Sequence, residues 1–187
     1  MPDDRIATAR SKRRPRTPAD VSDDAVAVAR TAFLDDANYY GCAESTLVAL
    51  KSVFDLPRPS DSSSAMAFNG GIAWTGGPCG AITGAALAIG MLAERRIPDH
   101  ARAKRVAREL VARLMAEFAE RHGSIDCRAL VGMDLRSPGA HDAFIASGAW
   151  RTGCMAQIEF AVARTAELAA DDAWEAAVAE LDLEAER

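Results

Sequence analysis

The sequence predicts an all-α fold, a compact bundle of about five to seven helices around a buried, Gly/Ala-rich central helix. Three observations support this prediction. Apolar residues recur at helical spacing in several long segments, no run of alternating β-branched residues indicates a strand, and residues 65–93 carry no charged side chain. A chain of 187 residues, 49% hydrophobic and 26% charged, can bury a core of this kind in one domain.

We expect residues 1–20 to form a disordered basic tail and residues 21–187 to form a single helical domain. The tail holds six basic and three acidic residues and lacks apolar periodicity. No apolar segment follows its positive residues, as a secretory signal would require, so we expect a cytoplasmic protein. The formal net charge of -5 and the interleaving of Glu with Arg argue against nucleic acid as a partner.

Two helices are expected before the uncharged stretch. Ser22 or Asp23 starts the first, because both side chains suit a helix N-terminus. A turn at residues 38–41 precedes the second helix, which begins at Cys42 and is closed by Pro57. Both helices carry apolar residues at helical spacing.

A glycine-rich loop feeds the central helix. After a short helical piece opened by capping residues 61–64, the run Gly76-Gly77-Pro78 precedes a helix expected to begin at about Pro78 and to end at about Ala93. Proline is tolerated there because its missing N–H would have no partner in a first turn. A membrane span would need about 20 continuous apolar residues, and the glycines interrupt the run, so no span is expected.

One face of the central helix is nearly without side chains. Gly80, Gly84 and Ala88 recur every fourth residue and therefore lie on the same side of the helix. Another segment must lie close against this face, either within the monomer or across the two-fold axis of a homodimer.

Helical segments also make up the second half of the chain. A long amphipathic helix runs from Asp99 to about His122, where Gly123 stops it. Residues 137–148 are expected to form a loop, because Pro and Gly stand near their start. The remaining segments are a short helix entered at 125–127, a long helix opened at 152–155 and an acidic helix over 171–187. Two acid–base pairs are spaced to interact on the wet side of the long amphipathic helix: Glu109/Arg113 and Glu117/Arg121.

The chemistry of the chain lies in four cysteines: Cys42, Cys79, Cys127 and Cys154. They are dozens of residues apart, so neither a local zinc pattern nor the haem attachment pattern CxxCH is present. Each follows a residue that favours a helix start: Gly41, Pro78, Asp126 and Gly153. Because helix N-termini favour an anion, four such starts converging on one anionic iron–sulfur cluster would explain this placement. Ordinary small buried cysteines are the alternative.

The run Cys79-Gly80-Ala81-Ile82-Thr83-Gly84 matches the CGAxxG segment of the redox-active family named C_GCAxxG_C_C. That family is defined by four cysteines in a small, mainly helical domain, and the other three cysteines of this chain align with it in order. The resemblance covers about residues 25–165. Members are often associated with transport or oxidoreductase functions, and some carry export signals that this sequence lacks.

The resemblance implies a redox site, and three hypotheses stay open. In the first, the four cysteines ligate an iron–sulfur cluster of the 4Fe–4S type beside Gly77, Gly80 and Gly84, for electron transfer, redox sensing or an accessory role to an oxidoreductase or transport system. In the second, the cysteines form thiol–disulfide pairs without metal, with Cys79 as the attacking thiolate because it lies at a helix start. In the third, the protein is a zinc-bound or purely packed helical scaffold. Neither a catalytic residue nor the redox partner follows from the sequence.

Five further residues are weaker candidates for a role in the site. Glu44, one turn into the second helix, could accept a proton near the site or simply complement the helix dipole. Trp74 could cover a cofactor, although a position in the core is expected. His100, His122 and His141 could be ligands or general bases, but a surface position is the expectation for each.

Overall fold

The computed structural model describes residues 17–37 and 39–185, and within them it confirms the all-α prediction, because helices dominate and no strand is present. The helices follow one another in the order α1 (Pro18–Phe33), α2 (Cys42–Val53), η1 (Ser63–Phe68), α3 (Gly80–Arg96), α4 (His100–His122), α5 (Cys127–Val131), α6 (Ala140–Ser147), η2 (Ala149–Arg151), α7 (Gly153–Ala166), η3 (Glu167–Ala169) and α8 (Asp171–Ala185). Most of the expected basic tail, residues 1–16, lies outside the described residues.

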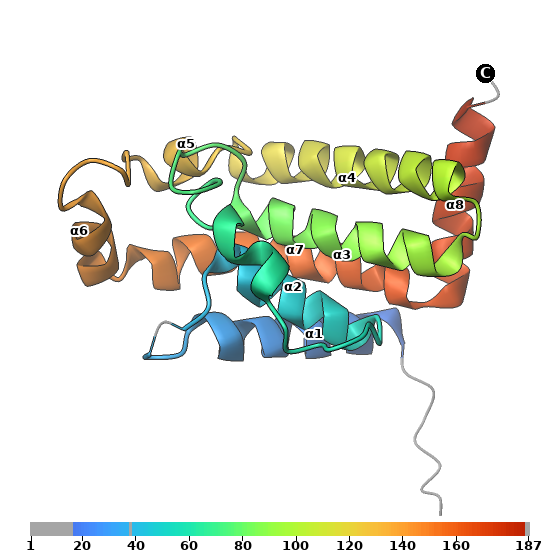
Figure 1. Cartoon of the computed structure of the whole chain (residues 1–187), viewed down its shortest axis with the longest axis horizontal. Helices are drawn as coiled ribbons and strands as arrows, with labels where there is room; N and C mark the ends of the chain where they lie inside the picture. The colour runs from blue at the N-terminus through green and yellow to red at the C-terminus, as the bar shows by residue number, and fades with distance from the viewer. Residues whose placement is uncertain (1–16, 38, 186–187) are drawn as a thin grey trace, which may run out of the picture.

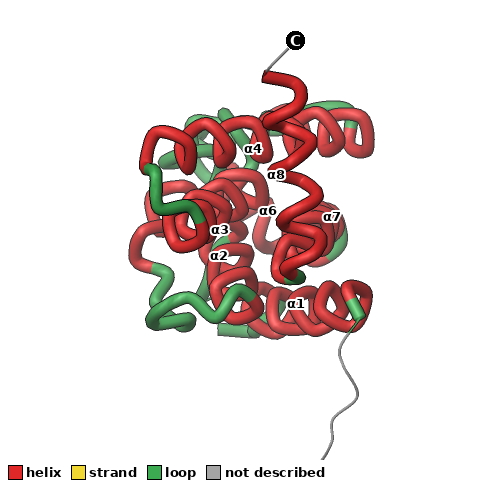
Figure 2. Tube along the Cα trace, turned by 90° about the vertical axis from the view of Figure 1, so that its right-hand side faces the viewer, coloured by secondary structure: helices red, strands yellow, loops and turns green. Residues whose placement is uncertain are grey.

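The long helices pack around α3, which lies between α2 and α4 (Figure 1). Seen along the bundle, α4 and α1 are on opposite sides, and α7 contacts both of them as well as α2 and α3 (Figure 2). Helix α8 crosses one end of the bundle, and α5 and α6 lie at the other end (Figure 1). The prediction of a central Gly/Ala-rich helix is confirmed, since Ala81, Ala85 and Ala88 of α3 are fully buried.

Glycines allow α3 to approach α2 closely. A Cβ atom on Gly84 would lie 2.4 Å from the carbonyl oxygen of Ala43, and one on Gly80 would lie 2.8 Å from the nitrogen of Ala43. Both distances are too short for non-bonded atoms, so a larger residue would push the two helices apart. The small-residue face of α3 therefore packs within the monomer, against α2.

Helix α1 begins at Pro18, earlier than the expected start at Ser22 or Asp23. The hydroxyl of Thr17 accepts a hydrogen bond from the backbone N–H of Asp20 at 3.2 Å, and the Asp20 carboxylate accepts one from the backbone N–H of Thr17 at 2.8 Å. This capping box satisfies backbone donors that a helix N-terminus otherwise leaves open. The described end of the expected tail is thus already helical.

Helix α6 occupies residues 140–147, where a loop was expected, so this prediction was wrong. Gly139 precedes the helix with a φ of 75°, and Gly148 ends it with a φ of 68°. A glycine in this conformation can flank either end of a helix, and the sequence did not distinguish that use from a loop. The apolar side chains of Phe144 and Ile145 pack toward the core from this helix.

The boundaries of α4 are those that the sequence predicts. The carboxylate of Asp99 accepts a hydrogen bond from the backbone N–H of Arg102 at 2.6 Å, and Gly123 ends the helix with a φ of 82°. Helix α4 is the longest element, but its sequence is rich in charge. Neither α4 nor any other helix within the described residues combines the length and the apolar character that a membrane crossing requires.

Two charged residues of α4, Arg113 and Glu117, form ion pairs with other helices. Arg113 binds Glu180 and Glu184 of α8 at 2.9 and 2.8 Å, and Glu117 binds Arg164 of α7 at 2.7 Å. The sequence identified these charged residues correctly but not their partners, because contacts between distant segments leave no periodic signal.

Candidate functional site

Each cysteine lies at the start of a helix, as the sequence predicts. Cys42 and Cys127 are the first residues of α2 and α5, Cys79 takes the N-cap position of α3, and Cys154 is the second residue of α7. The central helix starts at Gly80 rather than at the preceding proline, which forms an isolated antiparallel bridge with the segment before α5. Because Cys79 and Cys127 directly follow the two bridged residues, the bridge brings their chain segments side by side.

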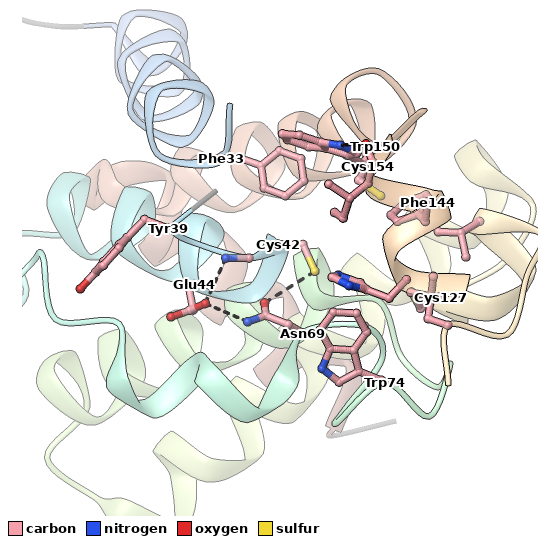
Figure 3. A pocket seen from close by; sticks show the side chains of 16 residues that line it. Phe33, Tyr39, Cys42, Glu44, Asn69, Trp74, Cys127, Phe144, Trp150 and Cys154 are labelled. Atoms are coloured by element: carbon pink, nitrogen blue, oxygen red, sulfur yellow. Dashed lines mark hydrogen bonds between the residues drawn. The ribbon is translucent and has the colours of Figure 1, made fainter. Parts of the chain in front are cut away.

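Three of the cysteines line one cavity of about 260 Å³. Cys42, Cys127 and Cys154 lie in its wall together with aromatic and aliphatic side chains (Figure 3): Phe33, Tyr39, Trp74, Val131, Leu135, Phe144, Ile145 and Trp150. Cys79 is not part of the wall and is 4% exposed, yet charge on any of the other three thiols would raise its pKa. The structure therefore brings the four cysteines into one region, three at the cavity and one behind it.

The sulfur of Cys42 is surrounded by backbone donors. The N–H groups of Ala43, Gly70 and Gly80 favour its thiolate and lower its pKa, but burial outweighs them and the net effect is a raised pKa. Gly80 is required for this approach, because a Cβ atom on it would lie 2.2 Å from the Cys42 sulfur. The motif glycine that follows Cys79 thus makes room for the sulfur of a different cysteine.

A hydrogen-bond network holds the turn that carries Cys42 (Figure 3). The side-chain oxygen of Asn69 accepts from the backbone N–H of Ala43 at 3.0 Å, and its nitrogen donates to Glu44 Oε2 at 2.8 Å. Glu44 also accepts from the backbone N–H of Gly41 at 3.0 Å and from the hydroxyl of Ser62 at 3.0 Å. Glu44 lines the cavity but is buried, and these donors occupy its carboxylate, so it holds the N-terminus of α2 in place.

The glycine-rich loop before α3 holds Cys127 through its backbone. The carbonyl oxygen of Gly77 accepts from the N–H of Cys127 at 2.7 Å, and that of Gly76 accepts from the N–H of Arg128 at 3.0 Å. In the opposite direction, the N–H of Cys79 donates to the carbonyl oxygen of Ile125 at 2.7 Å. These bonds fix the relative positions of the two cysteines on either side of the loop.

Burial raises the pKa of every thiol in the site. The pKa of Cys127 rises to about 11 and that of Cys154 to about 12, in both cases mainly because burial disfavours the thiolate. The pKa of Cys79 is raised well above its ordinary value, and its sulfur lies 3.6 Å from the side-chain oxygen of Gln157. In the protein without metal, burial therefore opposes the thiolate that the helix start was expected to favour at Cys79.

The loop contains a left-handed turn next to the cavity. Five consecutive residues, from Gly70 to Trp74, have positive φ angles between 49° and 70°. The turn places Trp74 at the cavity with its ring centroid 4.0 Å from that of His141 in α6. Trp74 is 37% exposed, so the expectation of a core position was wrong.

The remaining candidates from the sequence lie apart from the cavity wall. His100 is exposed and lies 2.8 Å from a carboxylate oxygen of Glu94, and His122 packs against Phe118 with ring centroids 4.5 Å apart. Gly84 faces α2 rather than the cavity. Of the three histidine candidates, His141 alone lines the cavity within the described residues. Asn69 was missed, although it stands directly before two glycines, which could have drawn attention to it.

The cysteine side chains are the possible metal donors of the site. Within residues 17–37 and 39–185, no three His, Cys, Asp or Glu side chains are arranged to hold a single metal ion. Four thiols from four chain segments, with backbone N–H groups directed at Cys42, do fit the chemistry of a thiolate-bound cluster, which is larger than one ion and carries negative charge.

The structure is a helical domain with four cysteines at helix starts, three of which line one cavity. The chain belongs to the family described as "Putative redox-active protein (C_GCAxxG_C_C)", whose model matches residues 40–168. The match includes all four cysteines and confirms the resemblance seen in the sequence. No curated protein and no solved structure matches the chain.

Proposed function

We propose that Cys42, Cys79, Cys127 and Cys154 together ligate one iron–sulfur cluster of the 4Fe–4S type, and that the protein transfers electrons or senses redox state. The observation that carries this proposal is the convergence of four thiols, each from a different helix start, on one region of the fold. A 4Fe–4S cluster takes four cysteine thiolates. The redox-active description of the family agrees with this function.

The electrostatics of the site favour a metal centre over free thiolates. Burial raises the pKa of all four thiols, so each stays protonated at neutral pH unless a positive charge compensates. Neither Lys nor Arg lines the cavity in the described part of the chain. Iron would supply the missing positive charge, because a metal deprotonates the thiol that coordinates it.

The groups of the chain itself would hold the thiolates and limit access of water. The N–H groups of Gly70 and Gly80 donate toward the sulfur of Cys42 and offset part of its negative charge. The aromatic wall around Phe33 and Trp150 makes the surroundings apolar, which influences the potential of a redox centre. The cluster would supply reversible one-electron chemistry, and an oxidoreductase or a transport system is the expected kind of partner.

A thiol–disulfide function without metal is the second candidate. One observation favours it, which is that Cys42, Cys127 and Cys154 line the same cavity. The raised pKa values of these thiols oppose it, because the thiolate and not the thiol attacks a disulfide.

Protein purified without oxygen distinguishes these functions. For the cluster, we expect a brown protein with broad visible absorption that each single Cys→Ala substitution reduces. The control Ala93→Ser, a small change at another buried position of α3, retains the absorption. A colourless protein that loses free thiols on mild oxidation would instead support the disulfide function, and a colourless protein that contains zinc would support a zinc-bound scaffold.

A further inference from the structure

Asn69 links the glycine-rich loop to the helix start that carries Cys42. It follows η1 directly, and its side-chain oxygen lies 3.0 Å from the backbone nitrogen of Ala43 and 3.8 Å from the sulfur of Cys42 (Figure 3). The next residue in the chain, Gly70, directs its backbone N–H toward the same sulfur. A displacement of Asn69 would therefore change two of the groups around Cys42 together.

Glu44 fixes which end of the Asn69 amide faces the sulfur. The amide nitrogen donates to Glu44 Oε2 at 2.8 Å and to the carbonyl oxygen of Met66 at 3.2 Å. Both of these groups only accept hydrogen bonds, and the N–H of Ala43 only donates. Turning the amide over would break all three bonds, so the oxygen and not the nitrogen lies toward Cys42.

The packing around Asn69 leaves no freedom for another position. A Cβ atom on Gly41 would lie 2.3 Å from the Asn69 side chain, so the backbone before Cys42 lies directly on the amide. Glu44 is 8% exposed, and the N–H of Gly41 and the hydroxyl of Ser62 hold its carboxylate in place. Asn69 itself is only partly buried, but a network in which each of these members has a partner favours one geometry.

We infer that Asn69 is a positioning residue for Cys42, held by Glu44, and that its amide oxygen lowers the reduction potential of the site. This inference rests on the proposed cluster and adds a residue to it. A reduced cluster carries one more negative charge than an oxidised one, so a negative dipole end near a ligating sulfur opposes reduction. The backbone N–H groups of Gly70 and Gly80 act in the opposite direction.

Two substitutions test this role. Asn69→Leu removes the amide at similar volume, and Asn69→Asp replaces it with a carboxylate. The control is Thr75→Val, which removes a hydrogen bond within the same loop, from the Thr75 hydroxyl to the carbonyl oxygen of Gly71, without touching Cys42.

The first measurement uses reduced protein without iron and does not depend on the cluster. Iodoacetamide modification is followed at each cysteine by mass spectrometry. The thiol of Cys42 donates a hydrogen bond to the side-chain oxygen of Asn69, which stabilises the unreactive thiol over the thiolate. In Asn69→Leu this bond is lost, so we expect Cys42 to react about 2- to 10-fold faster. Cys154 and the Thr75→Val protein serve as references and should react as in the wild type.

The second measurement is the reduction potential of the protein loaded with iron and sulfide. We expect the potential to rise in Asn69→Leu and to fall in Asn69→Asp, with Thr75→Val unchanged.

Equal Cys42 reactivity and equal potential in Asn69→Leu and the wild type would overturn the inference, even if the cluster forms. If Asn69→Leu does not fold, Asn69→Asp provides the comparison, because a carboxylate beside Cys42 should lower the potential and slow its modification. A wild-type protein that binds no iron would contradict the proposed function instead, while the reactivity of Cys42 would still decide the role of Asn69.

Discussion

At the scale of single residues, the site depends on glycines that stand where a side chain would collide with a cysteine. Gly80 lies against the sulfur of Cys42, and a Cβ atom on Gly71 would lie 2.8 Å from the Cβ of Cys127. The glycine in the motif after Cys79 therefore has a steric purpose that involves a second cysteine. Gly90 in the same helix has open space around it.

Replacement of Gly80 and of Gly90 by alanine should have opposite effects on the stability of the protein. We expect Gly80→Ala to displace Cys42 and to destabilise the protein by about 1–3 kcal/mol, the usual cost of overpacking. Gly90→Ala should stabilise it by about 0.5–1 kcal/mol, because alanine is the better helix former and nothing lies within 4 Å. Urea unfolding of the reduced proteins measures both changes. Equal stability of the Gly80→Ala and wild-type proteins would show that the close contact with Cys42 is absent.

His122 gives the protein a dependence on pH that is separate from the cysteines. Its ring packs between Phe118 and Phe160, its Nε2 atom is buried without a partner in the described structure, and burial lowers its pKa below 6.5. Below pH 6.5 the unfolded chain therefore binds more protons at this residue than the folded one, so stability falls as the pH drops. His122→Phe should lose less stability than the wild type between pH 7.5 and pH 5, as measured by urea unfolding. An equal loss in both proteins would contradict the burial of the ring.

At the scale of elements, the left-handed turn of the glycine-rich loop is the most unusual feature. Ile72, Ala73 and Trp74 adopt positive φ angles of 60°, 49° and 67° although they carry side chains. Such a conformation costs about 1–2 kcal/mol per residue. Backbone bonds from Gly76 to Gly70 and from Gly77 to Gly71 hold the turn together, both at 3.1 Å. The strain lies beside the cavity, where it fixes the position of Trp74.

Replacement of Ala73, which has a positive φ angle, by glycine should not destabilise the protein as an alanine-to-glycine change in a helix does. Ala73 is exposed, so Ala73→Gly removes strain without loss of packing, and we expect unchanged or higher stability, by up to about 1 kcal/mol. The matched control is Ala176→Gly at an exposed position of the right-handed helix α8, which should lose about 1 kcal/mol. Urea unfolding compares the two. Equal losses would contradict the left-handed conformation at Ala73.

The sequence predicted the elements where local signals are unambiguous. Asp99 and Gly123 marked the ends of α4, and each cysteine was correctly assigned to a helix start. The start of α1 and the whole of α6 were missed, because Thr17 and Gly139 belong to residue types that also occur in loops. The parts of the site that depend on contacts across the chain, such as Asn69 against α2, leave no pattern in one sequence.

At the scale of the whole molecule, the region that matches the family contains the four cysteines, whereas α1 and α8 lie outside it and pack against its helices. Residues 40–168 contain the four cysteines and run from α2 to the end of α7. Helix α1 packs against α2 and α7 from one side, and α8 contacts α4 and buries Trp174 at the end of the bundle away from α6. Helix α1 thus supports two helices that carry cysteines, whereas α8 supports α4, and among the described residues of these two helices only Phe33 lines the cavity.

The proposed function requires that the fold bring four distant thiols together for one iron–sulfur cluster. The measurement that tests this most directly is the iron and acid-labile sulfide content of the protein purified without oxygen. We expect about four iron and four sulfide ions per chain, as a 4Fe–4S cluster requires. Protein that contains neither after this purification, and that takes up neither when incubated with ferrous iron and sulfide, would contradict the central claim.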